Sequence, residues 1–154
     1  PYKKEQLEYF VYTALWTELN TDHQVSDVAV VKTFDLNTCT LEEANCVEPT
    51  NFEITINDSC IVSGFAGWFT VDFNGSPSVP ATFPVVLTTG PEGGYTHWGQ
   101  QVFYFYNPVE ADNGDKFTGV MEMVRQQRNQ RLYNMRVQYS VNGRETISSI
   151  YEMP

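Results

Sequence analysis

The sequence predicts a mainly β protein, an antiparallel barrel or sandwich with one helical segment at its N-terminus. Short runs of β-branched and aromatic residues recur along most of the chain, and turn-forming residues separate them. The length of 154 residues suits one domain that can bury a sizeable core. These observations favour a single β domain.

The helical segment is predicted over residues 3–19. One apolar stripe recurs at helical spacing, formed by Leu7, Phe10, Val11, Ala14 and Leu15. A second stripe beside it contains Tyr9, Tyr12 and Trp16. A helix on the surface of its own domain needs only one apolar face. Two stripes therefore favour contact with a further part of the protein or another subunit, and a helix sunk into its own core is the alternative.

The β pattern begins at residue 28. Strands are predicted over residues 28–34, 51–57, 60–73, 84–89, 101–106, 117–124, 131–141 and 144–153. In the second of these, Phe52, Ile54 and Ile56 alternate onto one side. The small residues at 63–67 indicate a bulge or a close backbone approach within 60–73. Asn142-Gly143 is typical of a tight hairpin turn, and residues 111–115 predict another reversal.

Charge is unevenly distributed along the chain, whose net charge is −10. Residues 1–60 hold 11 acids and 3 bases, residues 61–115 hold 5 acids and no base, and residues 116–154 hold 3 acids and 6 bases. An acidic surface disfavours nucleic acid and anionic membranes and favours basic partners. A simply well-solvated surface is equally compatible with the same counts.

The cysteines bear on the cellular compartment. Cys39, Cys46 and Cys60 cannot all pair within one chain, and they follow no CxxC spacing. Small buried thiols in a reducing compartment, the cytoplasm or nucleus, are expected. The triplets starting at Asn57 and Asn74 fit N-glycosylation, which would instead indicate the secretory pathway. The chain begins with Pro1, which indicates a piece of a longer protein.

Most catalytic motifs are missing from the sequence. His23 and His97 lie far apart, with no cysteine–histidine cluster, so a metal site is not expected. No GxGxxG or GxxxxGK[ST] stretch is present to bind a cofactor's phosphates. Arg125, Arg128 and Arg131 form a basic cluster that lacks interleaved aromatic residues, which is typical of a solvated hairpin tip.

The loop GPEGGYTHWG, residues 90–99, is the strongest functional candidate in the sequence. Gly93 and Gly94 allow backbone conformations that other residues avoid. His97 can donate and accept hydrogen bonds, and Trp98 offers a broad flat ring that suits a groove or a guanidinium. The structural alternative is that Trp98 caps the barrel core and His97 is an ordinary surface residue.

The stretch LTTGPEGGYTHWGQQVF resembles the Thr-His-Trp loop region of the protein arginine methyltransferases. Upstream, SGFAGWFTVDF resembles that family's preceding strand, and NGDKFTG resembles its next turn and strand. The match is strong over residues 60–107 and looser over 25–59 and 108–154. The predicted helix resembles the rear part of the family's dimerisation arm, and the overall likeness is to plant-type members.

The resemblance implies a specific organisation. Residues 1–24 would be the rear part of the arm, and residues 25–154 the β-barrel substrate-binding domain. A Rossmann-like domain that binds S-adenosylmethionine would be absent from this chain. Thr96, His97 and Trp98 would lie at the active-site mouth, His97 paired with an acid of the other domain and Trp98 shaping the arginine slot. Tyr9, Tyr12 and Trp16 would serve a homodimer.

Thr-His-Trp at this position implies monomethyl and asymmetric dimethyl products. Arg-rich protein substrates are the partners implied. The chain departs from the family pattern in lacking the glycine-rich cofactor loop and the paired glutamates that grip the guanidinium. Alone, it is therefore expected neither to bind cofactor nor to transfer methyl. The alternative is a non-catalytic binding module, such as a carbohydrate-binding β-sandwich with Trp98 as a sugar platform.

Overall fold

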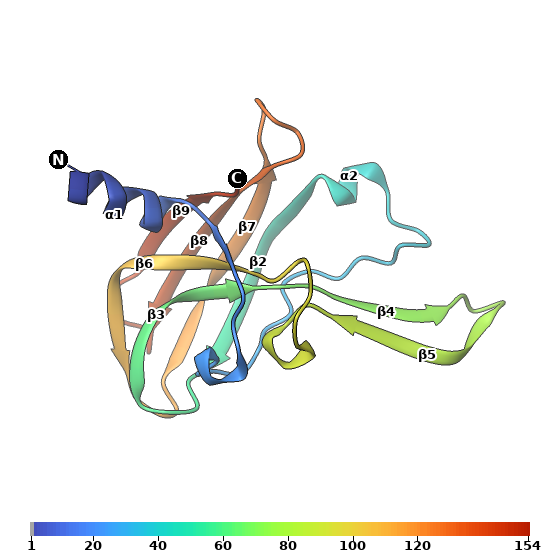
Figure 1. The fold of residues 1–154 in the computed structure, drawn as a ribbon, viewed down its shortest axis with the longest axis horizontal. Helices are drawn as coiled ribbons and strands as arrows, with labels where there is room; N and C mark the ends of the chain where they lie inside the picture. The colour runs from blue at the N-terminus through green and yellow to red at the C-terminus, as the bar shows by residue number, and fades with distance from the viewer. Residues whose placement is uncertain (1) are drawn as a thin grey trace.

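The computed structural model describes residues 2–154, and it is built mainly from antiparallel strands (Figure 1). The helical elements in this part of the chain are α1 (Tyr2–Tyr12), α2 (Leu41–Ala44) and two short 3₁₀ turns, η1 (Thr21–His23) and η2 (Pro91–Gly93). The strands are β1 (Leu15–Thr17), β2 (Cys46–Thr55), β3 (Cys60–Gly67), β4 (Thr70–Gly75), β5 (Pro80–Thr88), β6 (Gln100–Ala111), β7 (Lys116–Arg125), β8 (Tyr133–Val141) and β9 (Ile147–Glu152). The predicted fold class is confirmed.

Two sheets enclose the core. One has the order β2-β7-β8-β9 and the other β1-β6-β3, and all neighbouring strands are antiparallel. Between them, the rings of Phe65, Phe105, Phe117 and Tyr139 pack at centroid distances of 4.8–6.3 Å. The Tyr151 hydroxyl donates to the Tyr104 carbonyl oxygen at 3.0 Å. Edge-to-face and stacked aromatic pairs of this kind add to the burial of apolar surface.

The predicted turns are confirmed. Asn142 and Gly143 both have positive φ, 51° and 69°, as a tight hairpin between β8 and β9 requires. The reversal at 111–115 joins β6 to β7. There the Asp115 carboxylate accepts bonds from the Asp112 backbone N–H and the Asn142 side chain, which lower the pKa of Asp115.

The helix predicted over residues 3–19 is wrong in its length, because α1 ends at Tyr12. The Ala14 N–H donates to the Glu152 carbonyl at 2.8 Å, and Leu15–Thr17 pair with β6. Sheet partners thus satisfy backbone groups that a longer helix would have bonded internally. Of the predicted first stripe, Val11 and Ala14 are buried, whereas Leu7 and Phe10 are exposed.

Two predicted strands also need correction. Residues 28–34 have no strand partner. The residues just before them are tied to the end of β2 by the bridge Ser26–Ile56 and by the bond from the Asp27 N–H to the Thr55 carbonyl at 3.1 Å. Of this segment Val31 packs on the core, whereas Val28 and Val30 are exposed. The single strand predicted over 60–73 divides into β3 and β4, which belong to different sheets.

The predicted bulge lies in β3. Its register with β6 shifts between Val62 and Gly64. A Cβ on Gly64 would collide with the Phe103 carbonyl oxygen, so the small residue permits this close strand approach. The three cysteines are free and half-buried. No described helix is long and apolar enough to cross a membrane.

β4 and β5 form a two-stranded ribbon that extends away from the two-sheet body (Figure 1). The ribbon pairs Thr70 with Thr88 at its base and Phe73 with Val85 further out. The loop of residues 89–99 leads from the ribbon's base back into β6. The candidate site therefore lies where the ribbon joins the body.

Candidate functional site

Buried polar side chains anchor both ends of the Thr-His-Trp loop. Thr89 is fully buried, and its N–H and hydroxyl both bond the Phe69 carbonyl, at 3.0 and 3.1 Å. At the other end, the Gln100 side chain is 3% exposed and donates to the Thr89 carbonyl at 2.7 Å. Gln100 also accepts from the Leu19 N–H at 2.7 Å. The loop is consequently closed at its base by one glutamine.

The first half of the loop is a short, hydrogen-bonded turn. The Thr88 hydroxyl donates to the Glu92 carboxylate at 2.8 Å and accepts from the Gly90 N–H at 3.0 Å. Pro91 begins η2, a position where its fixed φ and missing N–H carry no cost. Gly94 follows with a φ of 74°, which turns the chain outward toward Tyr95.

The structure places Thr96, His97 and Trp98 together on the outer half of the loop. Thr96 is half-buried, and its hydroxyl accepts from the Gly99 N–H at 3.3 Å. The His97 ring is exposed and lies 6.0 Å from the Tyr95 ring, edge to face. His97 is thus presented to solvent, where a group from another domain can reach it.

Trp98 is held from two sides while more than half of it stays exposed. Its ring packs edge to face on Phe69, with centroids 5.8 Å apart. Its carbonyl accepts from the Trp16 indole N–H at 2.6 Å. Gly99 follows with a φ of 51°, and a Cβ there would meet the Trp16 ring at 2.7 Å. The indole ring of Trp98 is therefore fixed in place but open to a ligand.

Sequence reasoning missed the residues that support this loop. Phe69, Gln100 and the contact of Trp16 with Trp98 were not expected, because Trp16 was assigned to a helix. The partners Trp16 and Trp98 lie 82 positions apart, and Leu19 and Gln100 lie 81 apart. The one available signal was Gln100 itself, a polar residue at the start of an apolar strand.

The proposed dimerisation residues divide between two elements. Tyr9 and Tyr12 lie on α1, 55% and 54% exposed, and Trp16 lies on β1, 54% exposed. Because Trp16 also bonds the Trp98 carbonyl, it belongs to the loop's support as well as to this surface. The second apolar stripe is therefore exposed along its length, although only its first part is helical.

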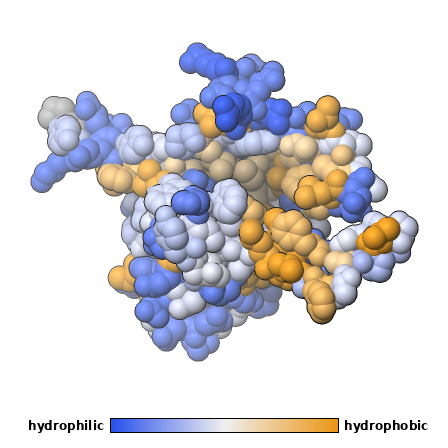
Figure 2. All heavy atoms as spheres, turned by 45° about the vertical axis from the view of Figure 1, so that its right-hand side comes forward, coloured by the Kyte–Doolittle hydropathy of each residue, from blue (hydrophilic) through white to orange (hydrophobic). Residues whose placement is uncertain are grey.

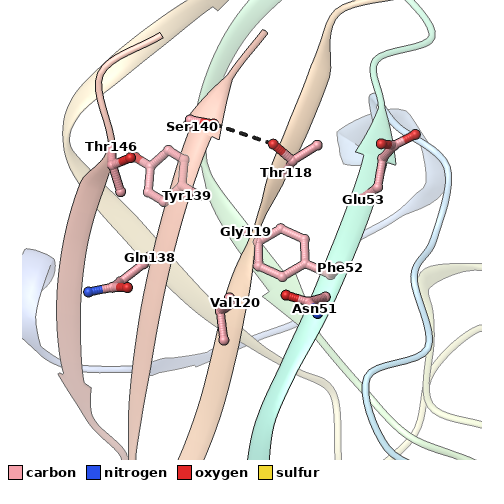
Figure 3. Close-up of a pocket in the computed structure, with 10 residues that line it drawn as sticks. All are labelled: Asn51, Phe52, Glu53, Thr118, Gly119, Val120, Gln138, Tyr139, Ser140 and Thr146. Carbon is pink, nitrogen blue, oxygen red and sulfur yellow. Dashed lines mark hydrogen bonds between the residues drawn. The ribbon is translucent and has the colours of Figure 1, made fainter. Parts of the chain in front are cut away.

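Neither the basic cluster nor the hollow on the four-stranded sheet provides a reactive centre in the described residues. Arg125 stacks over the Tyr133 ring at 5.7 Å, and Arg128 and Arg131 are exposed on the β7–β8 tip. A hollow of about 620 Å³ lies on the four-stranded sheet beside Gly119 (Figure 3). Figure 3 shows it lined by side chains of β2, β7 and β8, with Thr118 and Ser140 hydrogen-bonded across it at 3.3 Å.

That hollow does not fit a nucleoside cofactor. It lies open on the face of the sheet, and its one carboxylate, Glu53, pairs with Lys116. Burial raises the pKa of the Tyr139 hydroxyl, so this phenol stays neutral. No group of three or more potential metal ligands occurs within residues 2–154. The Thr-His-Trp loop is the better candidate because its rings are presented on a fixed frame.

The two-sheet fold with its N-terminal helix is that of the C-terminal barrel half of arginine methyltransferases. The chain belongs to the family described as the arginine methyltransferase oligomerization subdomain, whose model matches residues 3–144. The sequence left two interpretations, a methyltransferase half and a non-catalytic binding module. This match favours the methyltransferase half. The resemblance to the family is confirmed.

Two of the relatives are plant proteins. Protein arginine N-methyltransferase PRMT10 of Arabidopsis thaliana is 32% identical over 157 residues, covering 98% of this chain and 41% of the relative. PRMT10 of Oryza sativa subsp. japonica is 34% identical over 145 residues, covering 92% and 37%. The chain spans less than half the length of these relatives.

Solved structures agree with the fold. The crystal structure of Arabidopsis thaliana protein arginine methyltransferase 10 matches with a TM-score of 0.89 and 31% identity, over 99% of this chain and 45% of that one. The Trypanosoma brucei PRMT1 enzyme-prozyme heterotetrameric complex with AdoHcy matches with a TM-score of 0.83. At 20% identity, covering 97% of this chain and 46% of that one, the second match shows the fold alone.

Proposed function

We propose that this chain is the substrate-binding and dimerisation half of a protein arginine methyltransferase. The intact enzyme would transfer a methyl group from S-adenosylmethionine to arginine nitrogens of proteins. The observation that carries this proposal is the family match over residues 3–144, which includes the exposed Thr-His-Trp loop. The loop is the part of this half that presents rings suited to a guanidinium.

The cofactor belongs to the other half of the enzyme in this proposal. The open hollow beside Gly119, whose one carboxylate is Glu53, offers S-adenosylmethionine no enclosed site. When bound to the intact enzyme, the cofactor supplies the methyl group. The residues of this chain would contribute positioning, which lowers the barrier by holding the acceptor nitrogen in line.

Each loop residue has a proposed role. Trp98 would form one wall of the arginine slot, since its ring is fixed by Phe69 and its backbone by Trp16. His97 would pair with a carboxylate of the cofactor-binding domain and hold the two halves closed. Thr96 would keep the turn in shape through its bond with the Gly99 N–H.

Partners and products follow from the same proposal. The net charge of −10 suits Arg-rich protein substrates, and the Thr-His-Trp sequence suits monomethyl and asymmetric dimethyl products. Tyr9, Tyr12 and Trp16 would contribute to a homodimer of the intact enzyme. The free cysteines suit the cytoplasm or nucleus.

Kinetics of loop variants in the full-length enzyme test the proposal. We expect Trp98→Ala to raise the KM for an arginine peptide and His97→Ala to lower kcat, each by about tenfold or more. Cofactor affinity should stay within about twofold. Tyr106→Ala, an exposed aromatic on β6, is the matched control and should behave like the wild type. Wild-type kinetics in both loop variants would remove the loop from the active site.

A further inference from the structure

The arginines of the chain are confined to one stretch of its sequence. All five lie in residues 125–144, whereas the four lysines lie elsewhere. No aspartate or glutamate occurs in residues 123–144, so all 19 acids belong to the remainder of the chain. A compact positive region is therefore set into an otherwise acidic protein.

Three of these arginines gather at the hairpin between β7 and β8, which we call the arginine tip (residues 125–131). Arg125 ends β7, and Arg128 and Arg131 are exposed in the loop that follows. The hairpin extends beyond the ends of the sheets (Figure 1), and Figure 2 shows it as a hydrophilic projection at the top of the molecule. The tip is therefore accessible to a partner from solvent.

The charges of the arginine tip are not neutralised by the described part of the chain. Arg136, further along β8, pairs with Glu122 at 3.1 Å. By contrast, no carboxylate within residues 2–154 forms an ion pair with Arg125, Arg128 or Arg131. These three positive charges are consequently available to a negatively charged partner.

Arg125 is fixed at the base of the tip by Tyr133. Its guanidinium stacks over the Tyr133 ring at 5.7 Å, and its Nη2 donates to the tyrosine hydroxyl at 3.3 Å. The Arg125 Nε is buried and has no hydrogen-bond partner among the described residues. Burying a charged group without its full set of partners costs free energy, and an anion held nearby offsets part of that cost.

Hydrogen bonds hold the loop of the tip in one shape. The Gln126 N–H donates to the Leu132 carbonyl at 2.9 Å, and the Leu132 N–H donates to the Asn129 carbonyl at 3.0 Å. The Asn129 side chain accepts from the Arg131 N–H at 3.1 Å, and the Gln126 amide donates to the Met153 carbonyl at 3.3 Å. A loop that is ordered before binding loses less conformational entropy when a ligand arrives.

The chemistry of the tip favours carboxylates carried on a short segment. A guanidinium binds a carboxylate through two parallel hydrogen bonds, a geometry that an ammonium group lacks. Nucleic acid or an anionic membrane would extend past the tip toward the acidic remainder of the chain, where repulsion acts over about 8–10 Å. Single-stranded nucleic acid also needs free aromatic rings for stacking, and the Tyr133 ring already stacks with Arg125.

We propose that the arginine tip is a docking site for a segment of a partner protein that is rich in aspartate and glutamate. Arg128 and Arg131 would each bind a side-chain carboxylate, and Arg125 would supply a third positive charge at a fixed position. The tip lies away from the Thr-His-Trp loop (Figure 1), so this site is additional to the proposed function and does not rest on it.

Fluorescence anisotropy of the full-length protein with a fluorescein-labelled oligoglutamate peptide tests the docking site. Arg128→Gln with Arg131→Gln removes two exposed positive charges, and we expect the Kd to rise at least about tenfold. Arg128→Lys with Arg131→Lys keeps the charge without the planar fork, so the Kd should rise about threefold. Lys3→Gln with Lys4→Gln changes the net charge of the chain equally at exposed positions, and this matched control should stay within about twofold of the wild type.

The outcomes of this experiment separate the candidate partners. Absence of peptide binding, or an equal loss in the glutamine variant and the lysine control, would overturn the proposal. Tighter binding of oligouridine than of oligoglutamate, lost in the same glutamine variant, would assign the tip to nucleic acid and also overturn it. Self-association that the glutamine variant abolishes would make a second copy of the chain the partner instead, with the same consequence.

A folding defect is distinguished by two further measurements. Circular dichroism and methylation of an Arg-rich peptide should be unchanged in the glutamine variant, because its two side chains are exposed and lie away from the Thr-His-Trp loop. Loss of oligoglutamate binding in this folded protein supports the docking site. Oligoglutamate binding at the tip of a full-length protein that methylates no arginine would support the docking site while rejecting the proposed function.

Discussion

At the scale of single residues, Gln100 is the side chain that holds the two ends of the loop together. Its buried amide joins three segments: the end of β5, the stretch after β1 and the start of β6. Buried polar groups are costly unless paired, so replacing this side chain leaves the Thr89 carbonyl and the Leu19 N–H without their partner. The loop geometry depends on one amide placed between two backbone groups.

We predict that Gln100→Met, which nearly preserves side-chain volume, lowers the free energy of unfolding by about 2 kcal/mol. Urea denaturation of the 154-residue chain measures this loss. Gln101→Met, at the next position, is the control and should stay within about 0.5 kcal/mol of the wild type. If the two variants were equally stable, the amide contacts would contribute nothing.

The site also shows what residue patterns can and cannot reveal. The Thr-His-Trp loop stands out in sequence because a turn seldom carries His97 and Trp98 side by side. Its support does not stand out, because Trp16 and Leu19 reach the loop across more than 80 positions. Such contacts depend on sheet pairing, which no local pattern of residues encodes.

At the scale of elements, the alternation of apolar and polar residues correctly predicted strands that pair in the sheets. β8 buries every second residue, and Phe52 and Ile54, which alternate along β2, pack on the core. Residues 28–34 are also rich in β-branched residues but have no neighbouring strand. Their β propensity alone therefore predicted a strand that does not form. The helical spacing of apolar residues likewise continues past Tyr12, but the helix ends there. From Thr13 onward the backbone pairs with β9 and β6 instead.

The helix α1 provides the prediction at this scale. Tyr9 and Tyr12 are more than half exposed on an 11-residue helix that has one buried residue, Val11. Exposed aromatic rings at this density suit an interface. Tyr9→Glu with Tyr12→Glu should weaken self-association of the full-length enzyme about tenfold or more, since it places charges in an apolar contact.

Light scattering over a concentration series measures that association. Circular dichroism of the same variant should match the wild type, because neither tyrosine belongs to the buried core cluster and both are more than half exposed. Tyr2→Glu, 70% exposed at the helix start, is the matched control. Trp16 is excluded from the variant because its indole holds the Trp98 carbonyl. Unchanged association would take α1 out of the dimer interface.

At the scale of the whole molecule, the chain is one wall of a proposed active site. Rate acceleration in group transfer depends on holding donor and acceptor together, and a surface that offers only an acceptor slot cannot do so. We therefore predict that the isolated 154-residue chain neither binds S-adenosylmethionine in calorimetry nor transfers radiolabelled methyl to an Arg-rich peptide. The full-length enzyme under the same conditions is the positive control. Transfer by the isolated chain above the buffer blank would mean that it contains a complete catalytic centre, and the division of labour proposed here would be wrong.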